Sequence, residues 1–379
     1  MQQSKIFFAI TSILLATSVN ANNLGSEIEL LKTQLMQIQK RILELEKANN
    51  TKKISDPKIN KAIGANANEA NNSSTKNVDL YVSLRPTFGR IDEGDNEFWD
   101  VRDALSNAGI KSTFEFSSNW KAILHGEWGI DLSNNGDFGK ARQVYVALDS
   151  PYGQVGIGKQ RPVQYSFIAE YVDIFNHSLS PFAYDPESPF FVNNLLTYKK
   201  QINAFTLMLA SQFDGENAND DSDFFNAGIS YDSSGFHLGL TYSKKDRFIE
   251  NNNTGSNLIY AGSIAYTFDS DLYLAAGYQN IDYEYFNLND RQGHTFDMGL
   301  AYPINKYFKF KTGYFDFEDG LSDITSQNYQ GANITFEWLP ADGLRFHLEY
   351  LYKDFDVKPD FSSYSLGFRY DLSKKWEFN

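Results

Sequence analysis

Charged side chains gather in one long connection of the sequence, where they could act on passing solutes. The segment from Arg161 to Phe191 carries Glu170, Asp173, Asp185 and Glu187 among prolines and aromatic rings. A connection of this length in a compact domain usually has a function of its own. Carboxylates that face basic side chains across water select solutes by size and by sign of charge. We therefore expect a charge filter here; the alternative is a loop that packs over the domain's mouth or onto a neighbouring subunit.

Residues for covalent or metal chemistry are sparse by comparison. The chain has no cysteine, and its five histidines, at positions 125, 177, 237, 294 and 347, show no metal-ligand spacing. Gly153, Gly156 and Gly158 precede Lys159, but they belong to a strand that no helix follows, so they do not form a phosphate loop. The sequence therefore predicts that the protein is not an enzyme and uses no cofactor and no metal.

Composition and the N-terminus restrict the class of protein further. The 379 residues carry a net charge of −14, which argues against binding to nucleic acid. No uncharged apolar run reaches the roughly 18 residues of a membrane helix. The nearest is Ile6 to Val19, which follows Lys5 and precedes Asn20-Ala21, a pattern typical of a secretory signal peptide. We predict cleavage after Ala21, so residues 1–21 are excluded from the fold.

A heptad pattern follows the signal peptide. Apolar residues spaced alternately by four and three form the seam of a coiled coil over 22–47, and they are Leu24, Ile28, Leu31, Leu35, Ile38, Ile42 and Leu45. Because isolated helices of this length are marginally stable, the seam implies partner chains, and a parallel trimer fits it at least as well as a dimer. The alternative is an amphipathic helix that lies on its own domain. Residues 48–77 lose all periodicity and read as a flexible linker.

The body of the chain, 78–379, alternates apolar and polar residues almost throughout. It holds 24 Lys and Arg against 42 Asp and Glu, a net charge of −18. From Leu344 to Tyr352 one face reads Leu, Phe, Leu, Tyr, Tyr and the other Arg, His, Glu, Leu. A strand with one wholly apolar face contacts two different solvents, which is typical of an outer-membrane barrel with lipid outside and water inside. A soluble all-β domain is the alternative.

The connections between these segments favour the barrel. Tight turns such as Asp149 to Gly153, Asp232 to Gly235 and Asp269 to Asp271 alternate with long polar connections. The predicted long connections are Ile91 to Ala108, Asp214 to Asp223, Asp246 to Ser256 and Phe317 to Ser326. The fold class is therefore all-β: a transmembrane antiparallel β-barrel of about 16 strands, with 18 possible, around a lumen too wide for side chains to fill.

Several segments resemble the general trimeric porins of Gram-negative outer membranes. The resemblance lies in Asp79-Leu80-Tyr81, Trp120-Lys121-Ala122 with Gly126-Glu127-Trp128, Lys140 to Leu148, Tyr152 to Gln160, Asp173 to Asn176, and Phe190-Phe191-Val192 before Tyr198. It covers the first half of the barrel by motif and the second half by pattern alone. It implies that the long connection folds into the pore and forms a constriction.

Carried over residue by residue, the resemblance gives a constriction with a weakened basic side. Lys140 and Arg142 match the family's basic wall, and Asp173 matches an acidic residue of its loop. Arg85 stands two residues from Ser83, while Ser83, Asn107 and Asn194 occupy places where the family commonly has Lys or Arg. His177 stands near the place of a second loop carboxylate. The predicted constriction residues are Lys140, Arg142, Asp173, Arg85, Glu170, His177, Asp185 and Glu187. The acidic body suggests weak selectivity that leans towards cations.

These patterns together predict a homotrimeric outer-membrane porin with its coiled coil in the periplasm. It would pass ions and small hydrophilic solutes by passive diffusion; the alternatives are a substrate-selective porin or a structural or adhesive barrel with a plugged lumen. Expected partners are outer-membrane lipid and lipopolysaccharide, with divalent cations at acidic loops, and peptidoglycan through the coiled coil. The last strand ends at either Leu372 or Phe378.

Overall fold

The described part of the chain is almost entirely β-strand. The computed structural model describes residues 75–133, 136–177, 181, 186–213, 223–249, 252–286 and 289–378. The predicted signal peptide, coiled coil and most of the linker lie outside these residues, as do Asp185 and most of the stretch from Asp214 to Asp223. Within the described ranges, no helix has both the length and the apolar character needed to cross a membrane.

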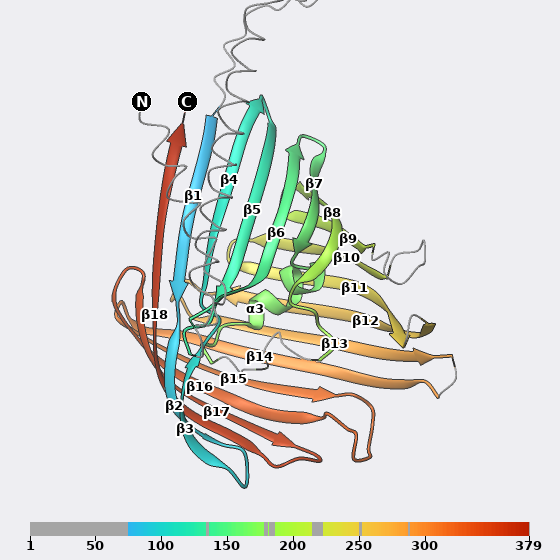
Figure 1. The fold of residues 1–379 in the computed structure, drawn as a ribbon, viewed down its shortest axis with the longest axis vertical. Coiled ribbons are helices and arrows are strands. Elements are labelled where there is room, and N and C mark those ends of the chain that lie inside the picture. The colour runs from blue at the N-terminus through green and yellow to red at the C-terminus, as the bar shows by residue number, and fades with distance from the viewer. Residues whose placement is uncertain are drawn as a thin grey trace, which may run out of the picture. The chain divides into compact units, whose positions relative to one another are not determined.

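The described residues form eighteen strand segments and one short helical turn (Figure 1). In chain order the strands are β1 (Thr75–Leu84), β2 (Pro86–Asp92), β3 (Glu97–Asp103), β4 (Asn107–Ser117), β5 (Trp120–Ile130), β6 (Phe138–Ser150), β7 (Gly153–Gln160), β8 (Val192–Ile202), β9 (Phe205–Gln212), β10 (Phe224–Ser233), β11 (Phe236–Ile249), β12 (Asn252–Thr267), β13 (Tyr273–Tyr285), β14 (Arg291–Asn305), β15 (Phe308–Glu318), β16 (Tyr329–Ala341), β17 (Leu344–Phe355) and β18 (Phe361–Phe378). The helical turn, between β7 and β8, consists of η2 (Tyr165–Ala169) and α3 (Glu170–Val172).

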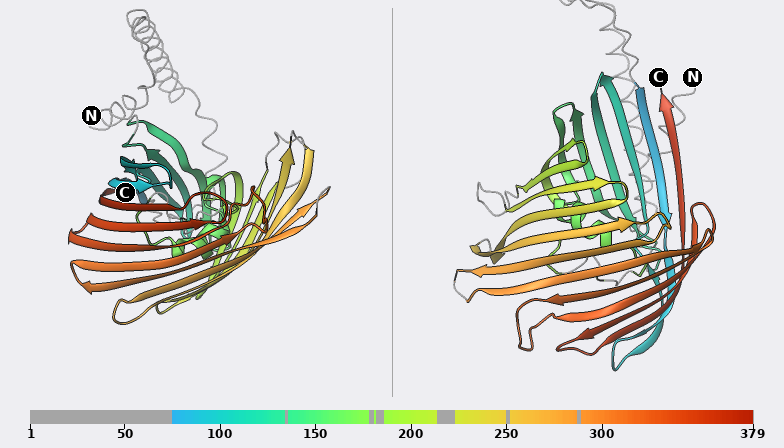
Figure 2. Two further views of the ribbon diagram at one scale, coloured as in Figure 1. Left: turned by 90° about the horizontal axis from the view of Figure 1, so that it is seen from below. Right: turned by 180° about the vertical axis from the view of Figure 1, so that it is seen from behind.

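The segments form a closed antiparallel barrel of sixteen strands. β1 and β2 are two parts of one strand, because both pair with β18, and β3 and β4 are two parts of the next, because β3 pairs with β2 and β4 with β1. Each later strand pairs with its neighbours in sequence, and β18 closes the ring against β1 (Figures 1 and 2). The strand number predicted from the sequence is therefore confirmed.

Two of the predicted long connections are wrong. The segment from Ile91 to Ala108 is mostly strand, because β2 and β3 form a hairpin whose register runs from Pro86↔Asp103 to Asp92↔Glu97. Most of the segment from Asp246 to Ser256 also extends the ladder of β11 and β12. The polar residues of both segments misled the prediction, because their backbones nevertheless pair in antiparallel ladders. The last strand reaches Phe378, which decides between the two predicted ends.

Side chains on the two faces of the wall differ as the alternation predicts. On β16 the polar residues Asn333, Thr335 and Glu337 are each 0% exposed, while Ile334, Phe336 and Trp338 are 40–45% exposed on the other face. Such exposed apolar side chains match a lipid environment on the outside of the barrel. The polar face is the inner one, and it is buried here because part of the chain lies against it.

Part of the lumen is filled by apolar packing, which the sequence pattern did not predict. Val163, Phe167 and Ile168 of the long connection belong to one buried cluster with inward-facing residues of β8, β9, β10, β12, β13 and β15, including Tyr283 and Phe317. A second cluster joins Val172 to β2, β12, β13, β15, β17 and β18. Water therefore does not occupy the whole cross-section of this barrel.

Candidate functional site

The long connection from Arg161 to Phe191 lies inside the barrel. Figures 1 and 2 show η2 and α3 among the strands, with β4 to β7 on one side and β11 to β14 on the other. Four inward-facing glycines of the wall provide the space. A Cβ built on each would approach the connection, from Gly228 to Val163 at 2.8 Å, Gly239 to Phe167 at 2.3 Å, Gly277 to Ile168 at 3.5 Å and Gly299 to Ile174 at 2.9 Å. Glycine thus permits close backbone approach along β10, β11, β13 and β14.

Polar contacts fix the first part of the connection on this wall. Gln164 donates through its backbone N–H to Asn226 Oδ1 at 2.7 Å and through its side-chain Nε2 to Gln279 Oε1 at 2.6 Å. The carbonyl of Phe167 accepts a hydrogen bond of 2.6 Å from Ser263 Oγ. Because buried polar groups are costly when unpaired, these contacts specify one position for η2.

Charged groups of the opposite wall hold the tip of the connection. Lys311 Nζ donates to the Ile174 carbonyl at 2.6 Å and lies 2.6 Å from Glu337 Oε1. Asn176 donates through Nδ2 to the same Glu337 oxygen at 2.9 Å and accepts from Arg345 at 3.0 Å. Glu337 is 0% exposed. Charge-assisted hydrogen bonds of this kind are each worth about 1.5–3 kcal/mol, so the tip is fixed to β15, β16 and β17.

Two large cavities of the described residues share two lining residues. The turn-side cavity, of about 810 Å³, adjoins the short turns at Asp271 and Lys306. The loop-side cavity, of about 760 Å³, adjoins the connection between β5 and β6, at Asp131 and Asp137. Leu105 and Arg142 line both cavities. We call this junction the neck.

Irregularities in the strand ladders place the residues at and beside the neck. Arg85 lies in the break between β1 and β2, and Leu105 lies in the break between β3 and β4 with φ of 68°. Arg142 is a bulge residue, because the register passes from Glu127↔Gln143 to Trp128↔Ala141 and leaves Arg142 without a partner on β5. Bulges re-aim side chains, which is how all three residues come to line the turn-side cavity.

The predicted constriction residues are only partly brought together. Arg85, Arg142, Glu170, Asp173 and His177 all line the turn-side cavity. Lys140 lines the loop-side cavity.

Glu187 accepts a hydrogen bond of 2.6 Å from Asn257 Nδ2 on β12, so it helps to hold the connection in place. Asp185 lies outside the described residues. Ser83 accepts a hydrogen bond of 2.8 Å from Arg85 Nε, which links the two positions that the sequence placed on one face.

Five cations of the turn-side cavity come from the second half of the barrel, where the sequence offered pattern but no motif. They are Lys306, Lys309, Lys311, Arg345 and Arg369. Strand alternation could have found four of them, since Lys309 and Lys311 alternate with phenylalanines on β15 and Arg345 and Arg369 lie on the polar faces of β17 and β18. Arg161, at the start of the long connection, also lines this cavity.

The turn-side cavity is positive although the body of the chain is acidic. Among the described residues, its eight cations, the five above with Arg85, Arg142 and Arg161, face three carboxylates, Glu170, Asp173 and Asp271. Three more carboxylates pair with lining cations, Glu127 with Arg142, Glu337 with Lys311 and Asp371 with Arg369. Eight against six leaves a positive excess. The loop-side cavity has four aspartates against three cations.

Asp173 is the lining carboxylate whose ionisation is most perturbed. Burial raises its pKa to about 6, and the nearby Arg161 guanidinium opposes this rise. Tyr165 donates a hydrogen bond to Asp173 Oδ2 at 3.3 Å. Asp173 therefore gains or loses its charge close to neutral pH, and the positive excess of the cavity grows as the pH falls.

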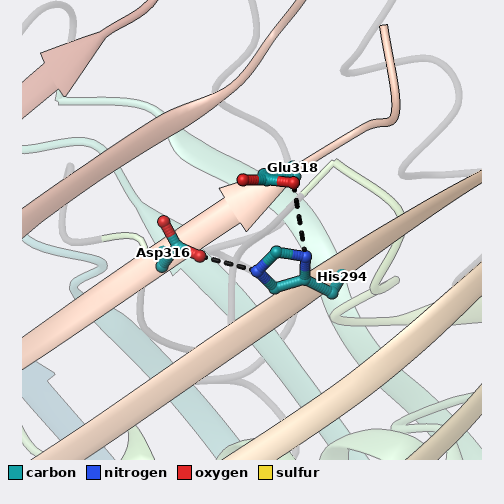
Figure 3. A group of neighbouring side chains, drawn as sticks. All are labelled: His294, Asp316 and Glu318. Carbon is teal, nitrogen blue, oxygen red and sulfur yellow. Dashed lines mark hydrogen bonds and ion pairs between the residues drawn. The ribbon is translucent and has the colours of Figure 1, made fainter.

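One cluster of potential metal ligands lies on the outer face of the wall (Figure 3). His294 Nε2 is 2.7 Å from Asp316 Oδ2, and His294 Nδ1 is 3.6 Å from Glu318 Oε2. The two carboxylates face different ring nitrogens, so the imidazole bridges them and the three groups do not converge on one point. This geometry is that of an ion-paired bridge between β14 and β15.

Comparison with models of protein families gives a match over most of the chain. The model of a family described as Gram-negative porin matches residues 61–379. Among the curated proteins, none matches this sequence.

Several solved structures share the fold. The anion-selective porin from Comamonas acidovorans has a TM-score of 0.63 at 14% identity, over 78% of this chain and 100% of that one. OmpT of Vibrio cholerae in its trimer form has a TM-score of 0.62 at 16% identity, over 78% and 99%. The outer-membrane channel DcaP of Acinetobacter baumannii has a TM-score of 0.61 at 12% identity, over 78% and 97%.

Proposed function

This chain belongs to the Gram-negative porin family, and we propose on that premise that the neck filters solutes in its outer-membrane diffusion channel. The channel passes ions and small hydrophilic solutes passively and has no enzymatic activity. The observation that carries the proposal is the pair of cavities that meet at Leu105 and Arg142 beside a connection seated in the lumen. The path of solutes through the two cavities, which we call the conduit, runs along the wall of β3 to β6. The opposite side of the lumen holds the connection and its apolar packing.

The sign of selectivity follows from the turn-side cavity. Its positive excess favours anions over cations, which is opposite to the preference that the acidic composition suggested. The charges that line the conduit decide the sign of selectivity, because charges farther away than about one Debye length, roughly 8 Å in physiological salt, are screened. The similarity to a porin named as anion-selective is consistent with this sign.

Zero-current potentials in a gradient of potassium chloride across a planar bilayer test the proposal. We expect stable conductance steps and a potential of the sign for chloride preference. Replacing Lys306 and Lys309 by glutamine removes two lining cations, and it should reduce the chloride preference. The matched control is Lys374→Gln, because Lys374 is exposed on β18 and lines neither cavity. A cation preference of the wild-type channel would contradict the proposed selectivity.

A barrel with a plugged lumen is the second candidate, and the two apolar clusters in the lumen favour it. The bilayer measurement separates the two, since large steps mean a channel and silence means a plug. A substrate-selective channel remains compatible with the same geometry.

Assembly and location of the remaining segments complete the proposal. We propose a homotrimer, with residues 1–21 removed as a signal peptide and the coiled coil of 22–47 in the periplasm on its linker, 48–77. The coiled coil brings three chains together or reaches peptidoglycan. Deleting residues 22–50 should therefore reduce trimer yield or wall association, and normal values of both would exclude both roles. Binding of lipopolysaccharide through divalent cations at the acidic connection of Asp214 to Asp223 stays a prediction.

A further inference from the structure

The neck combines guanidinium groups with apolar surface, a mixture that a filter for inorganic ions does not need. Leu105 and Arg142 line both cavities, and the turn-side cavity adds Arg161, Tyr165 and Phe190 beside them. Inorganic anions gain nothing from contact with leucine or phenylalanine. The side chains at the neck therefore indicate which kind of anion binds there.

Leu105 occupies its place through an unusual backbone conformation. Its φ of 68° is uncommon for a residue other than Gly, Asn or Asp. Hydrogen bonds hold the break open: Ala104 N–H donates to the Arg85 carbonyl at 2.8 Å, and Ser106 N–H donates to Asp103 Oδ1 at 2.7 Å. A glycine or asparagine would adopt this φ more readily, so the leucine side chain itself has a use at the neck.

The guanidinium group of Arg161 lies against aromatic rings and has one buried donor without a partner. Its guanidinium carbon lies 3.7 Å from the ring centre of Tyr165 and 4.4 Å from that of Phe190, which fixes the plane of the group. Its NH1 atom is buried and has no hydrogen-bond partner. A buried donor of a charged group is costly to leave unpaired, so an oxyanion that enters the neck gains a strong hydrogen bond here. By contrast, Arg142 Nε already donates to Glu127 at 2.7 Å.

We propose that the neck is a binding subsite for organic anions with an apolar body. The carboxylate or phosphate group of the solute accepts hydrogen bonds from Arg161, and its apolar part lies against Leu105 and Phe190. This inference rests on the proposed channel function and goes beyond it, because it names a class of solute that is retained at the neck relative to inorganic anions and to small carboxylates such as acetate.

Interruption of the chloride current in planar bilayers measures this retention. Sodium benzoate and sodium acetate carry the same charged group and differ in the apolar body, while benzyl alcohol carries the ring without the charge. We expect benzoate to halve the current at a roughly tenfold lower concentration than acetate, the difference expected when part of one ring leaves water. Benzyl alcohol should have little effect, because it lacks the group that Arg161 binds.

Two variants test the named residues. Leu105→Asn keeps the size of the side chain and suits the positive φ, so it removes only the apolar surface. Arg161→Gln removes the guanidinium group and its unpaired donor. Each should abolish the difference between benzoate and acetate. Matched controls are Ile324→Ser, an exposed apolar residue outside both cavities, and Arg90→Gln, an arginine that pairs with Glu97 away from both cavities.

The possible results separate this inference from the proposed function. Equal potency of benzoate and acetate in a conducting, anion-selective channel would overturn the subsite alone. A difference that persists in both variants would also overturn it, because the named side chains would then play no part. If the barrel does not conduct, saturation-transfer NMR of benzoate with the detergent-solubilised protein still measures binding. In that case, contact in the wild type that is lost in Arg161→Gln supports the subsite, and no contact overturns it.

Discussion

Gly239 on β11 offers a direct test of how the long connection is seated. Replacing it by alanine places a Cβ 2.3 Å from the carbonyl oxygen of Phe167, whereas ordinary contact begins at 3.4 Å. The connection must then move by about 1.1 Å, because a strand in the middle of a closed barrel cannot retreat. The Gly239→Ala variant therefore displaces η2 without replacing any charged residue.

The cost of this displacement follows from the contacts of the Phe167 carbonyl. Ser263 Oγ donates to it at 2.6 Å, and His237 Nε2 lies 2.9 Å from it. Net values of about 0.5–1.5 kcal/mol for each hydrogen bond put the combined loss at about 2 kcal/mol. This free energy corresponds to a change of roughly thirtyfold in the ratio of seated to unseated connection.

Single-channel recordings in planar bilayers report this ratio. We expect the time spent at the conductance level of the unseated connection, relative to that of the seated one, to rise roughly thirtyfold in Gly239→Ala, since the unseated connection changes the width of the conduit. The control is Gly262→Ala on β12, because a Cβ there meets Leu240 at 3.5 Å and the Gly239 carbonyl at 3.7 Å, which is ordinary contact. Equal occupancies of the conductance levels in the two variants and the wild type would refute the reasoning, because Gly239 would then not position the connection.

Three further predictions follow from the charges around the conduit. Burial raises the pKa of Asp173 to about 6, so this carboxylate becomes neutral as the pH falls from 7 to 5; chloride preference should rise over that range in zero-current potentials, and Asp173→Asn should remove the rise. Glu337→Gln leaves Lys311 and Arg345 without their shared carboxylate, so chloride preference should increase while the free energy of unfolding in urea falls by about 3 kcal/mol; an unchanged stability would argue against the ion-paired tip of the connection. Arg142→Gln leaves Glu127, which is 11% exposed, with Tyr81 as its remaining partner; chloride preference should fall more than in Arg369→Gln, and the reverse order would place the filter away from the neck.

The strand order was accessible from the sequence because the pattern that encodes it is local. Asn333, Thr335 and Glu337 alternate with Ile334 and Phe336, and this period of two fixes both the strand and its two faces without knowledge of any neighbour. The connection from Arg161 to Phe191 was recognisable by its length alone. The errors at Ile91 to Ala108 and Asp246 to Ser256 have one cause: both segments are rich in the polar residues typical of loops, although their backbones pair as strands.

The constriction was only partly accessible, because ladder defects and distant strands assemble it. The bulge at Arg142 and the break at Leu105 depend on pairing with β5 and on hydrogen bonds to Arg85, and neither leaves a mark in the local sequence. Lys140 was grouped with Arg142 by the resemblance to the porin family, but it lines only the loop-side cavity.

Sequence alone determined the alternating strands, their number and the presence of one long connection, since each depends on residues within a few positions of one another. Tertiary structure decided the position of that connection, the filled part of the lumen and the sign of charge along the conduit. Net charge sums every loop of the chain with equal weight, whereas a solute in the conduit interacts with charges within about a Debye length. The cations that produce the positive excess at the turn-side cavity lie between Arg85 and Arg369 in the sequence, and only closure of the barrel brings them together.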